Sequence, residues 1–212
     1  MLIEKKQKIK GLTLIETLVA IAIFAIGMVG FSTLFVNAWR NNAYTIEMGQ
    51  SNLVISQGIS KMAGYIRKAR QGDDGSYPIK SAGSNDLIIY SDYNEDGITE
   101  RLHFYYANGT IFMGIATPTG TMPKIYPAND QQVIVIATKI VNTTSEPIFY
   151  YFNKNYPGDT ANNPVSIPVD ISTVRLVEIH LKININPNRA PDNIEMQSFV
   201  EIRNLNDYDH IQ

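Results

Sequence analysis

The feature that most constrains this chain is a long apolar stretch near its N-terminus. Residues Leu12 to Val36 form a run of 25 residues, of which 18 are apolar and only Glu16 is charged. A helix of that length, rising about 1.5 Å per residue, spans the roughly 30 Å hydrocarbon core of a bilayer. The stretch therefore predicts a helix that can cross a membrane.

The residues before this stretch are basic and predict its orientation. The first ten residues carry four lysines against Glu4, whereas the whole chain has a net charge of −2. Because positively charged flanks stay in the cytoplasm, we expect the N-terminus there and the rest of the chain beyond the membrane. The net charge gives no support for nucleic-acid binding. The chain has no cysteine, which excludes disulfides and thiolate metal sites.

Three interpretations of the apolar stretch compete. A cleavable secretory signal would have an apolar region of about 7 to 15 residues, and this run is longer, although Val36-Asn37-Ala38 could serve as the cleavage site. A plain membrane anchor leaves Glu16 unexplained, since an acid at the centre of a membrane helix costs about 2.5 to 3.5 kcal/mol even on insertion scales. The third interpretation gives this acid a role.

The junction between the basic and apolar segments has a specific pattern, namely Gly11-Leu12-Thr13-Leu14-Ile15-Glu16. It resembles the class III signal of type IV pilins and type II secretion pseudopilins, although that family most often has Phe or Met after the glycine. The resemblance implies cleavage after Gly11 by prepilin peptidase and methylation of the new N-terminus at Leu12. It also implies an inner-membrane precursor that an assembly platform builds, with other pilin or pseudopilin subunits, into a periplasmic or extracellular filament.

Glu16 has a physical reason to lie at this spacing. Cleavage after Gly11 exposes an α-amine that is cationic near neutral pH, and Glu16 is then the fifth residue. Because an unpaired charge of either sign is costly in lipid, the acid of one subunit and the amine of a neighbour should attract each other. Glu16 is therefore the predicted assembly residue, and a subunit that carries it is expected to pack beneath another subunit.

The helix is expected to continue well past the membrane. No proline occurs between Leu12 and Pro78, so the pattern predicts a helix from about Leu12 to Arg70. Apolar residues at helical spacing in its second half predict a face buried against a domain; they are Trp39, Ala43, Ile46, Leu53, Ile55, Ile59, Met62 and Ile66.

After Pro78 the pattern alternates, which predicts strands. The expected strands are 87–90, 101–106, 110–113, 132–138, 147–152, 173–185 and 194–203, with Asn108-Gly109 as a hairpin turn. Long loops are expected at 117–130 and 153–170, with Tyr126 and Tyr156 as loop anchors or contact residues. The fold class is thus α+β, a pilin-like long helix packed on an antiparallel β-sheet domain. Its expected parts are a leader (1–11), a transmembrane and polymerisation half of the helix (12–36), an amphipathic half (37–70) and a β-rich globular domain (71–212).

The turn from Asp92 to Gly97 matches the first half of a calcium loop, with oxygen ligands at alternate positions. The candidate ligands are Asp92, Asn94, Asp96 and the Ile98 carbonyl. The alternative is a hairpin turn stabilised by its own side chains, with Gly97 at positive φ. No other cofactor is expected.

No catalytic residues are predicted, and the chain is not expected to be an enzyme. His103, His180 and His210 have no metal-ligand spacing. Four glutamates could form paired carboxylates only by meeting in space, and each is expected on a solvated face; they are Glu100, Glu146, Glu178 and Glu201. The large loops and the terminal strand ending in Arg203-Asn204-Leu205 look most like a W-type minor pilin or a J-type pseudopilin. Two alternatives remain open, an exported β domain that binds carbohydrate or protein and a membrane-tethered hydrolase.

Overall fold

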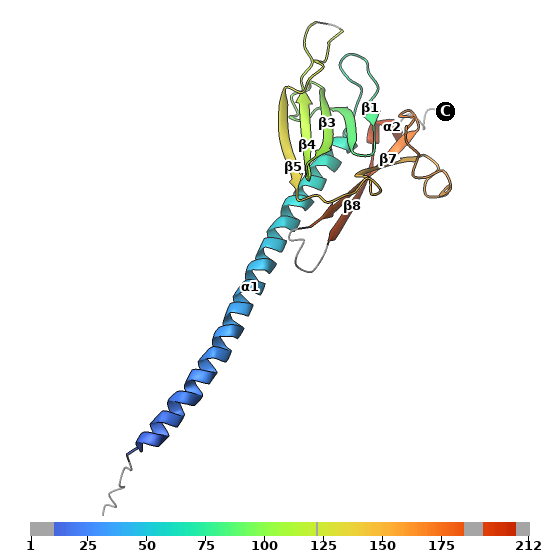
Figure 1. Ribbon diagram of the computed structural model, residues 1–212. Coiled ribbons are helices and arrows are strands. Elements are labelled where there is room, and N and C mark those ends of the chain that lie inside the picture. Colours follow the sequence, from blue (N-terminus) through green and yellow to red (C-terminus); the bar gives the residue numbers. More distant parts are fainter. Residues whose placement is uncertain (1–10, 122, 185–192, 207–212) are drawn as a thin grey trace, which may run out of the picture. The chain divides into compact units, whose positions relative to one another are not determined.

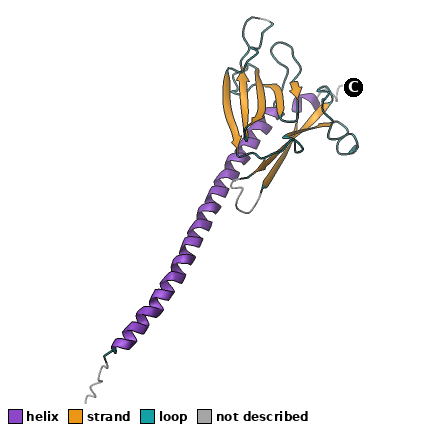
Figure 2. Ribbon diagram, in the orientation of Figure 1, coloured by secondary structure: helices purple, strands orange, loops and turns teal. Residues whose placement is uncertain are grey.

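The computed structural model describes residues 11–121, 123–184 and 193–206. The predicted leader up to Lys10, Ile185 at the end of a predicted strand, and His210 lie outside the described residues. The chain divides into two units, one up to Gly49 and one from Gln50 onward. Helix α1 (Leu14–Arg67) runs through both units, and everything after it belongs to the second (Figures 1 and 2).

The first unit is helical and exposed. Every residue from 11 to 43 is exposed, including large apolar side chains such as Leu14, Ile26 and Phe31. Within the described residues α1 is the one helix long and apolar enough to cross a membrane, by length and composition. An exposed apolar surface of this kind is unstable in water, so it needs lipid or other apolar helices around it.

The second unit contains two antiparallel sheets (Figure 2). The larger has the order β1-β2-β3-β4-β5 and the smaller the order β6-β7-β8. The strands are β1 (Ile79–Ala82), β2 (Asp86–Ser91), β3 (Glu100–Ala107), β4 (Thr110–Ala116), β5 (Gln132–Thr138), β6 (Phe149–Asn153), β7 (Val174–Ile183) and β8 (Ile194–Glu201). A short helix, α2 (Arg203–Asn206), follows.

The C-terminal part of α1 packs into one core with both sheets. Ile55, Ile59, Met62 and Ile66 are buried and belong to the same hydrophobic cluster as inward-facing residues of the strands. This confirms the expected α+β class and its pilin-like arrangement. The predicted apolar face was wrong in its first part: Trp39, Ala43, Ile46 and Leu53 are all exposed.

The end of α1 is three residues earlier than expected because the backbone changes partner. The amide of Arg70 donates to the carbonyl of Tyr90 in β2 (2.9 Å), which a helical Arg70 could not do. The side-chain amide of Asn204 in α2 donates to the free carbonyl of Ala69 (2.8 Å). A side chain thus satisfies a backbone acceptor just beyond the end of the helix.

The strand predictions are largely confirmed. In β7 the buried residues alternate with partly exposed ones from Val177 to Ile183, as its sequence pattern predicts. Asn108 and Gly109 both have positive φ (50° and 73°) between β3 and β4, as expected of a two-residue hairpin turn. The last strand ends at Glu201 instead of Arg203, since the chain turns there into α2. Strand β1 was not predicted.

Candidate functional site

The predicted processing and assembly residues lie together at the start of α1. Leu14 is the first helical residue, so Thr13 occupies the N-cap position and Glu16 the third helical position. Gly11 and Leu12 precede the helix, are exposed and belong to no helix or strand. The helix thus begins two residues later than predicted, and the Gly11-Leu12 bond lies outside it. A peptide bond in this position is accessible to a peptidase without unwinding a helical turn.

Thr13 and Glu16 form a reciprocal pair. The backbone amide and the hydroxyl of Thr13 each donate to Oε2 of Glu16, both at 2.8 Å. In return the Glu16 amide lies 3.4 Å from the Thr13 hydroxyl. This is a capping box, in which a threonine cap and a glutamate three residues later satisfy the first free amides of a helix. The carboxylate also lies where the positive end of the helix dipole favours a negative charge.

The sequence analysis did not assign a role to Thr13. The signal was present, since a Ser or Thr followed three residues later by Glu before an apolar run predicts a capping box. The structure therefore adds Thr13 to the candidate site as the residue that holds the Glu16 side chain. The Glu16 side chain points toward the N-terminal end of the helix. Its carboxylate bonds to Thr13, the residue that follows Leu12.

The predicted calcium turn is closed by its own hydrogen bonds. A carboxylate oxygen of Asp92 accepts from the Gly97 amide (3.0 Å), and one of Asp96 accepts from the Ile98 amide (2.8 Å). Asn94 accepts from the Asp96 amide (3.3 Å), and Gly97 has a φ of 89°. These bonds are those of the alternative interpretation, a hairpin turn stabilised by its side chains.

Basic residues that follow the end of α1 also contact this turn. A guanidinium nitrogen of Arg70 lies 3.4 Å from the Asp92 carboxylate, and Lys68 pairs with Glu95 at 2.7 Å. Across the described residues, no group of three or more His, Asp or Glu side chains is placed to hold a metal ion. The predicted set contains only two carboxylates, so calcium binding at this turn remains a prediction.

The four glutamates considered for catalysis lie on different elements. Glu146 precedes β6 and pairs with Lys182 (2.6 Å), which lowers its pKa. Glu178 is in β7 and Glu201 is in β8. Glu100 in β3 is only 1% exposed, so its predicted solvated position was wrong. Burial raises the pKa of Glu100, and its carboxylate accepts a hydrogen bond from the Tyr93 amide (3.3 Å).

The loop between β4 and β5 is anchored to the sheet. The Tyr126 hydroxyl donates to the Thr99 carbonyl (2.6 Å) and accepts from the Asp73 amide (3.0 Å). Burial raises the pKa of Tyr126 to about 12. Arg101 in β3 pairs with Asp130 of the same loop at 2.9 Å. Tyr126 is therefore a loop anchor, which was one of its two predicted roles.

The second long loop is anchored through Tyr156. Its ring lies 4.4 Å from that of Phe152 at the end of β6, measured between centroids. Tyr156 is partly buried by this contact. Both predicted loop tyrosines therefore hold their loops on the domain.

Comparison with protein families gives one match. The model of the prokaryotic N-terminal methylation motif matches residues 6–32. This motif is typical of type IV pilins and type II pseudopilins, which are structural proteins, and it implies prepilin processing and filament assembly. The match contains Gly11, Leu12, Thr13 and Glu16 and ends inside the apolar part of α1. Neither a curated protein nor a solved structure matches the chain.

Proposed function

We propose that this chain is a minor subunit of a type IV pilus or a type II secretion-like filament. Prepilin peptidase cuts after Gly11, Leu12 becomes the methylated N-terminus, and the apolar part of α1 polymerises with those of other subunits. The observation that carries this proposal is the Glu16 carboxylate, held 2.8 Å from the Thr13 amide beside the future N-terminus. A plain membrane anchor would gain only the helix cap from this charge, whereas a filament subunit also gains a counter-charge for a neighbour's N-terminus.

Glu16 supplies the counter-charge for assembly in this proposal. In the bilayer its carboxylate is costly, and the Thr13 bonds offset part of that cost because hydrogen bonds stabilise the charged form. The α-amine of a neighbouring subunit brings the opposite charge and reduces the penalty for both groups. The pairing also fixes the axial position of one helix against the next, since only one residue in the apolar run is charged.

The assignment to a minor subunit rests on the globular domain. Two anchored loops, one between β4 and β5 and one between β6 and β7, add surface that a repeating major subunit does not require. A W-type minor pilin or a J-type pseudopilin is the subtype that we propose. Such a subunit starts or caps a fibre, and Glu16 supports a position beneath another subunit.

The intact mass of the protein from its native host tests the processing step. We expect the mass of a chain that begins at Leu12 and carries one methyl group. A chain that begins at Trp39 would instead support the alternative of an exported β domain. A chain that retains Met1 would identify an unprocessed membrane protein. Either of these two masses overturns the proposal.

Substitution of the acid tests the assembly step. Glu16→Ala should leave membrane insertion intact and abolish incorporation into filaments, whereas Glu16→Asp should restore part of it. Glu47→Ala is the matched control, since it removes the same charge from α1 outside the apolar run. Normal incorporation of Glu16→Ala would contradict the proposed role of the acid.

A further inference from the structure

A basic pocket lies where the end of α1, the β2–β3 turn and the short helix α2 meet. It has a volume of about 600 Å³, within the range of roughly 300 to 1,000 Å³ for pockets that hold small ligands. All of its lining residues belong to the second unit. Two of them are acidic and four are cationic, so the lining carries an excess of two positive charges. The cations are Arg67, Lys68, Arg70 and Arg203, and the acids are Asp92 and Glu95.

The two acids are already matched with two of the cations. The Lys68 ammonium lies 2.7 Å from the Glu95 carboxylate. A guanidinium nitrogen of Arg70 lies 3.4 Å from the Asp92 carboxylate. Each acid thus compensates one cation, which leaves the excess charge on the other two.

Those two cations are Arg67, in the last turn of α1, and Arg203, at the start of α2. Both side chains are exposed, and neither has a hydrogen-bond or ion-pair partner among the residues that the structure describes. A guanidinium has five N–H donors in a planar fork and no acceptor, and its geometry matches carboxylate and phosphate oxygens. Two such groups at one pocket favour a ligand with two negative charges and several acceptor oxygens.

Arg70 adds a donor that is already fixed in place. Its Nε donates to the Thr99 hydroxyl (2.9 Å) and its Nη2 to the Gly97 carbonyl (3.0 Å). Across the described part of the chain, its Nη1 makes no hydrogen bond. Because the side chain is ordered before any ligand arrives, a contact with it costs little conformational entropy.

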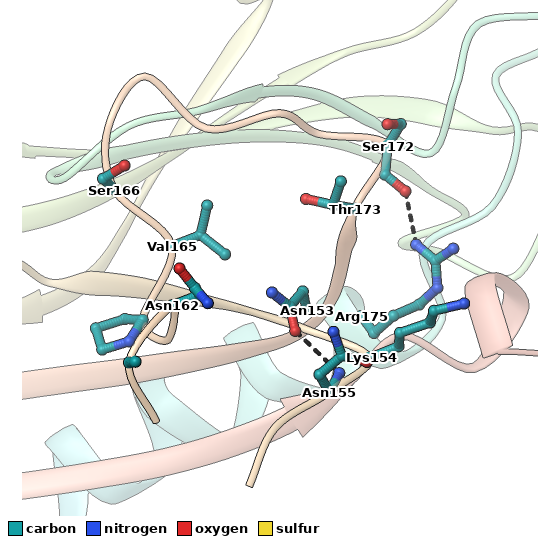
Figure 3. A pocket seen from close by; sticks show the side chains of 11 residues that line it. Asn153, Lys154, Asn155, Asn162, Val165, Ser166, Ser172, Thr173 and Arg175 are labelled. Atoms are coloured by element: carbon teal, nitrogen blue, oxygen red, sulfur yellow. Dashed lines mark hydrogen bonds between the residues drawn. The ribbon is translucent and has the colours of Figure 1, made fainter. Parts of the chain in front are cut away.

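A second pocket, between the loops at the end of β6 and the start of β7, serves as a comparison (Figure 3). Its volume is similar, about 550 Å³, and it also has two cations, Lys154 and Arg175. Figure 3 shows the Arg175 guanidinium bonded to the Ser172 carbonyl (2.7 Å). The same nitrogen donates to the Val174 carbonyl (3.0 Å). Arg175 is thus engaged within the protein, and the pocket beside α2 is the better anion site.

We propose that the pocket beside α2 binds a phosphate monoester, with Arg67 and Arg203 as the main contacts and Arg70 as a third donor. A phosphate monoester carries about −1.5 to −2 charge at pH 7 and three acceptor oxygens, which matches the excess charge of the lining. A single carboxylate would leave one guanidinium unmatched. The volume also leaves room for the esterified part of the ligand. This binding activity is separate from the filament role.

The test titrates the isotopically labelled full chain in detergent micelles at low ionic strength and follows its NMR signals. Glycerol 3-phosphate is the soluble probe, and it should bind with a Kd of about 1 mM, as expected for a ligand of its size. Succinate has the same charge but no phosphate group and should bind at least about fivefold more weakly, because each of its carboxylates offers fewer oxygens. Inorganic phosphate, which lacks the esterified part, should bind about threefold more weakly.

A further arm distinguishes two sources of the same phosphate group. Phosphatidate added to the micelles presents the monoester on a lipid, whereas glycerol 3-phosphate presents it in solution. Binding of both probes at the same residues supports recognition of the phosphate group itself. Binding of phosphatidate alone supports the monoester and identifies a lipid headgroup as its source.

Substitutions locate the binding in the pocket. Arg67→Gln and Arg203→Gln change exposed residues, so the fold is preserved, and each should weaken glycerol 3-phosphate binding about fivefold or more. Glu95→Gln releases Lys68 from its partner and should strengthen binding about twofold. Such a gain cannot arise from misfolding. Lys61→Gln is the control, since Lys61 is exposed on α1 and does not line the pocket, and it should have no effect.

Several results would overturn the proposal. The first is the absence of binding by both phosphate monoesters up to roughly fifty times the expected Kd. Equal affinity for succinate would remove the preference for phosphate, and equal affinity for inorganic phosphate would remove the role of the ester. Unchanged binding by Arg67→Gln and Arg203→Gln would place the ligand elsewhere. None of these results depends on whether the chain forms a filament.

Discussion

Gly58 in α1 lies directly against the backbone of Ile136 in β5. A Cβ atom added at Gly58 would lie 2.7 Å from the carbonyl oxygen of Ile136, closer than real Cβ contacts allow. Here the helix and the edge strand of the five-stranded sheet are too close to leave room for a side chain at Gly58. A glycine in a helix costs up to about 1 kcal/mol relative to alanine. At this position the glycine allows the helix to pack closely against β5.

Gly58→Ala is therefore expected to destabilise the domain by about 1 to 3 kcal/mol, because the added methyl group forces the helix away from β5. Gly64→Ala is a matched control on the same helix, since nothing lies within 4 Å of its Cβ position. That variant should stabilise the domain by roughly 0.5 to 1 kcal/mol. Thermal or denaturant unfolding of both variants measures the difference. Equal effects would mean that the close contact with Ile136 has no energetic weight.

The capping box at Thr13 predicts a local effect. Thr13→Val keeps the shape of the side chain but removes the hydroxyl that donates to Glu16. Losing an N-cap costs about 0.5 to 2 kcal/mol, so amide exchange in the first turn of α1 should become roughly 2- to 30-fold faster. Hydrogen exchange of the chain in micelles measures this. Thr17→Val is the control, because its hydroxyl bonds to the Leu14 carbonyl and not to Glu16. Similar exchange in both variants would argue against the capping role.

Burial of Glu100 predicts a pH dependence of stability. Its pKa is raised above the reference value of 4.5, chiefly by burial, so the folded state binds a proton more tightly than the unfolded state. The free energy of unfolding should therefore fall as the pH rises from about 4.5 through the folded-state pKa. Glu100→Gln removes this loss and should be more stable than the natural protein at neutral pH.

Glu146 provides a comparison of opposite sign. The hydrogen bond from Lys182 lowers its pKa, so its contribution is present above the reference value of 4.5 and is lost as the pH falls through the folded-state pKa. Glu146→Gln should therefore lower stability at neutral pH and have no effect in acid. Unfolding midpoints of both variants between pH 3 and 8 check the two signs, and a similar pH profile for both would contradict the assignment of Glu100.

Calcium binding at the Asp92 turn can be tested directly. Arg70 and backbone amides already engage its carboxylates, so an ion would have to compete with them. We expect any stabilisation only at millimolar calcium, as in weak extracellular sites. The unfolding midpoint should then rise with calcium, return with chelator, and stay constant in Asp96→Asn. A midpoint that millimolar calcium leaves unchanged in the natural protein removes the predicted site.

Local patterns were enough to predict the strands with strong signals. The Asn108-Gly109 turn and the alternation in β7 depend on neighbouring residues only, and both were predicted correctly. Strand β1 has only four residues and no clear alternation, and it exists because its backbone pairs with β2. The division of the strands into two sheets was also not predicted, since it depends on pairing between distant segments.

Burial of individual side chains was harder to predict than their elements. Glu100 was correctly expected near the start of a strand, but its burial was not. Glu100 is covered by the β2–β3 turn, in which the Tyr93 amide donates to the Glu100 carboxylate. Trp39 and Ile46 follow the helical pattern as well as Ile59 does, yet of these three only Ile59 is buried. A periodic pattern identifies a face that can be buried, and contacts with segments distant in the sequence decide how much of it is.

The capping box also has a consequence for how a fibre would be taken apart. In the lone chain Oε2 of Glu16 already accepts two hydrogen bonds from Thr13, so a neighbour's amine would add to a carboxylate that is partly satisfied. The electrostatic gain on joining is then smaller than it would be for an unpaired carboxylate, and so is the loss on leaving. A subunit built this way could return to the lipid with its carboxylate still hydrogen-bonded to Thr13.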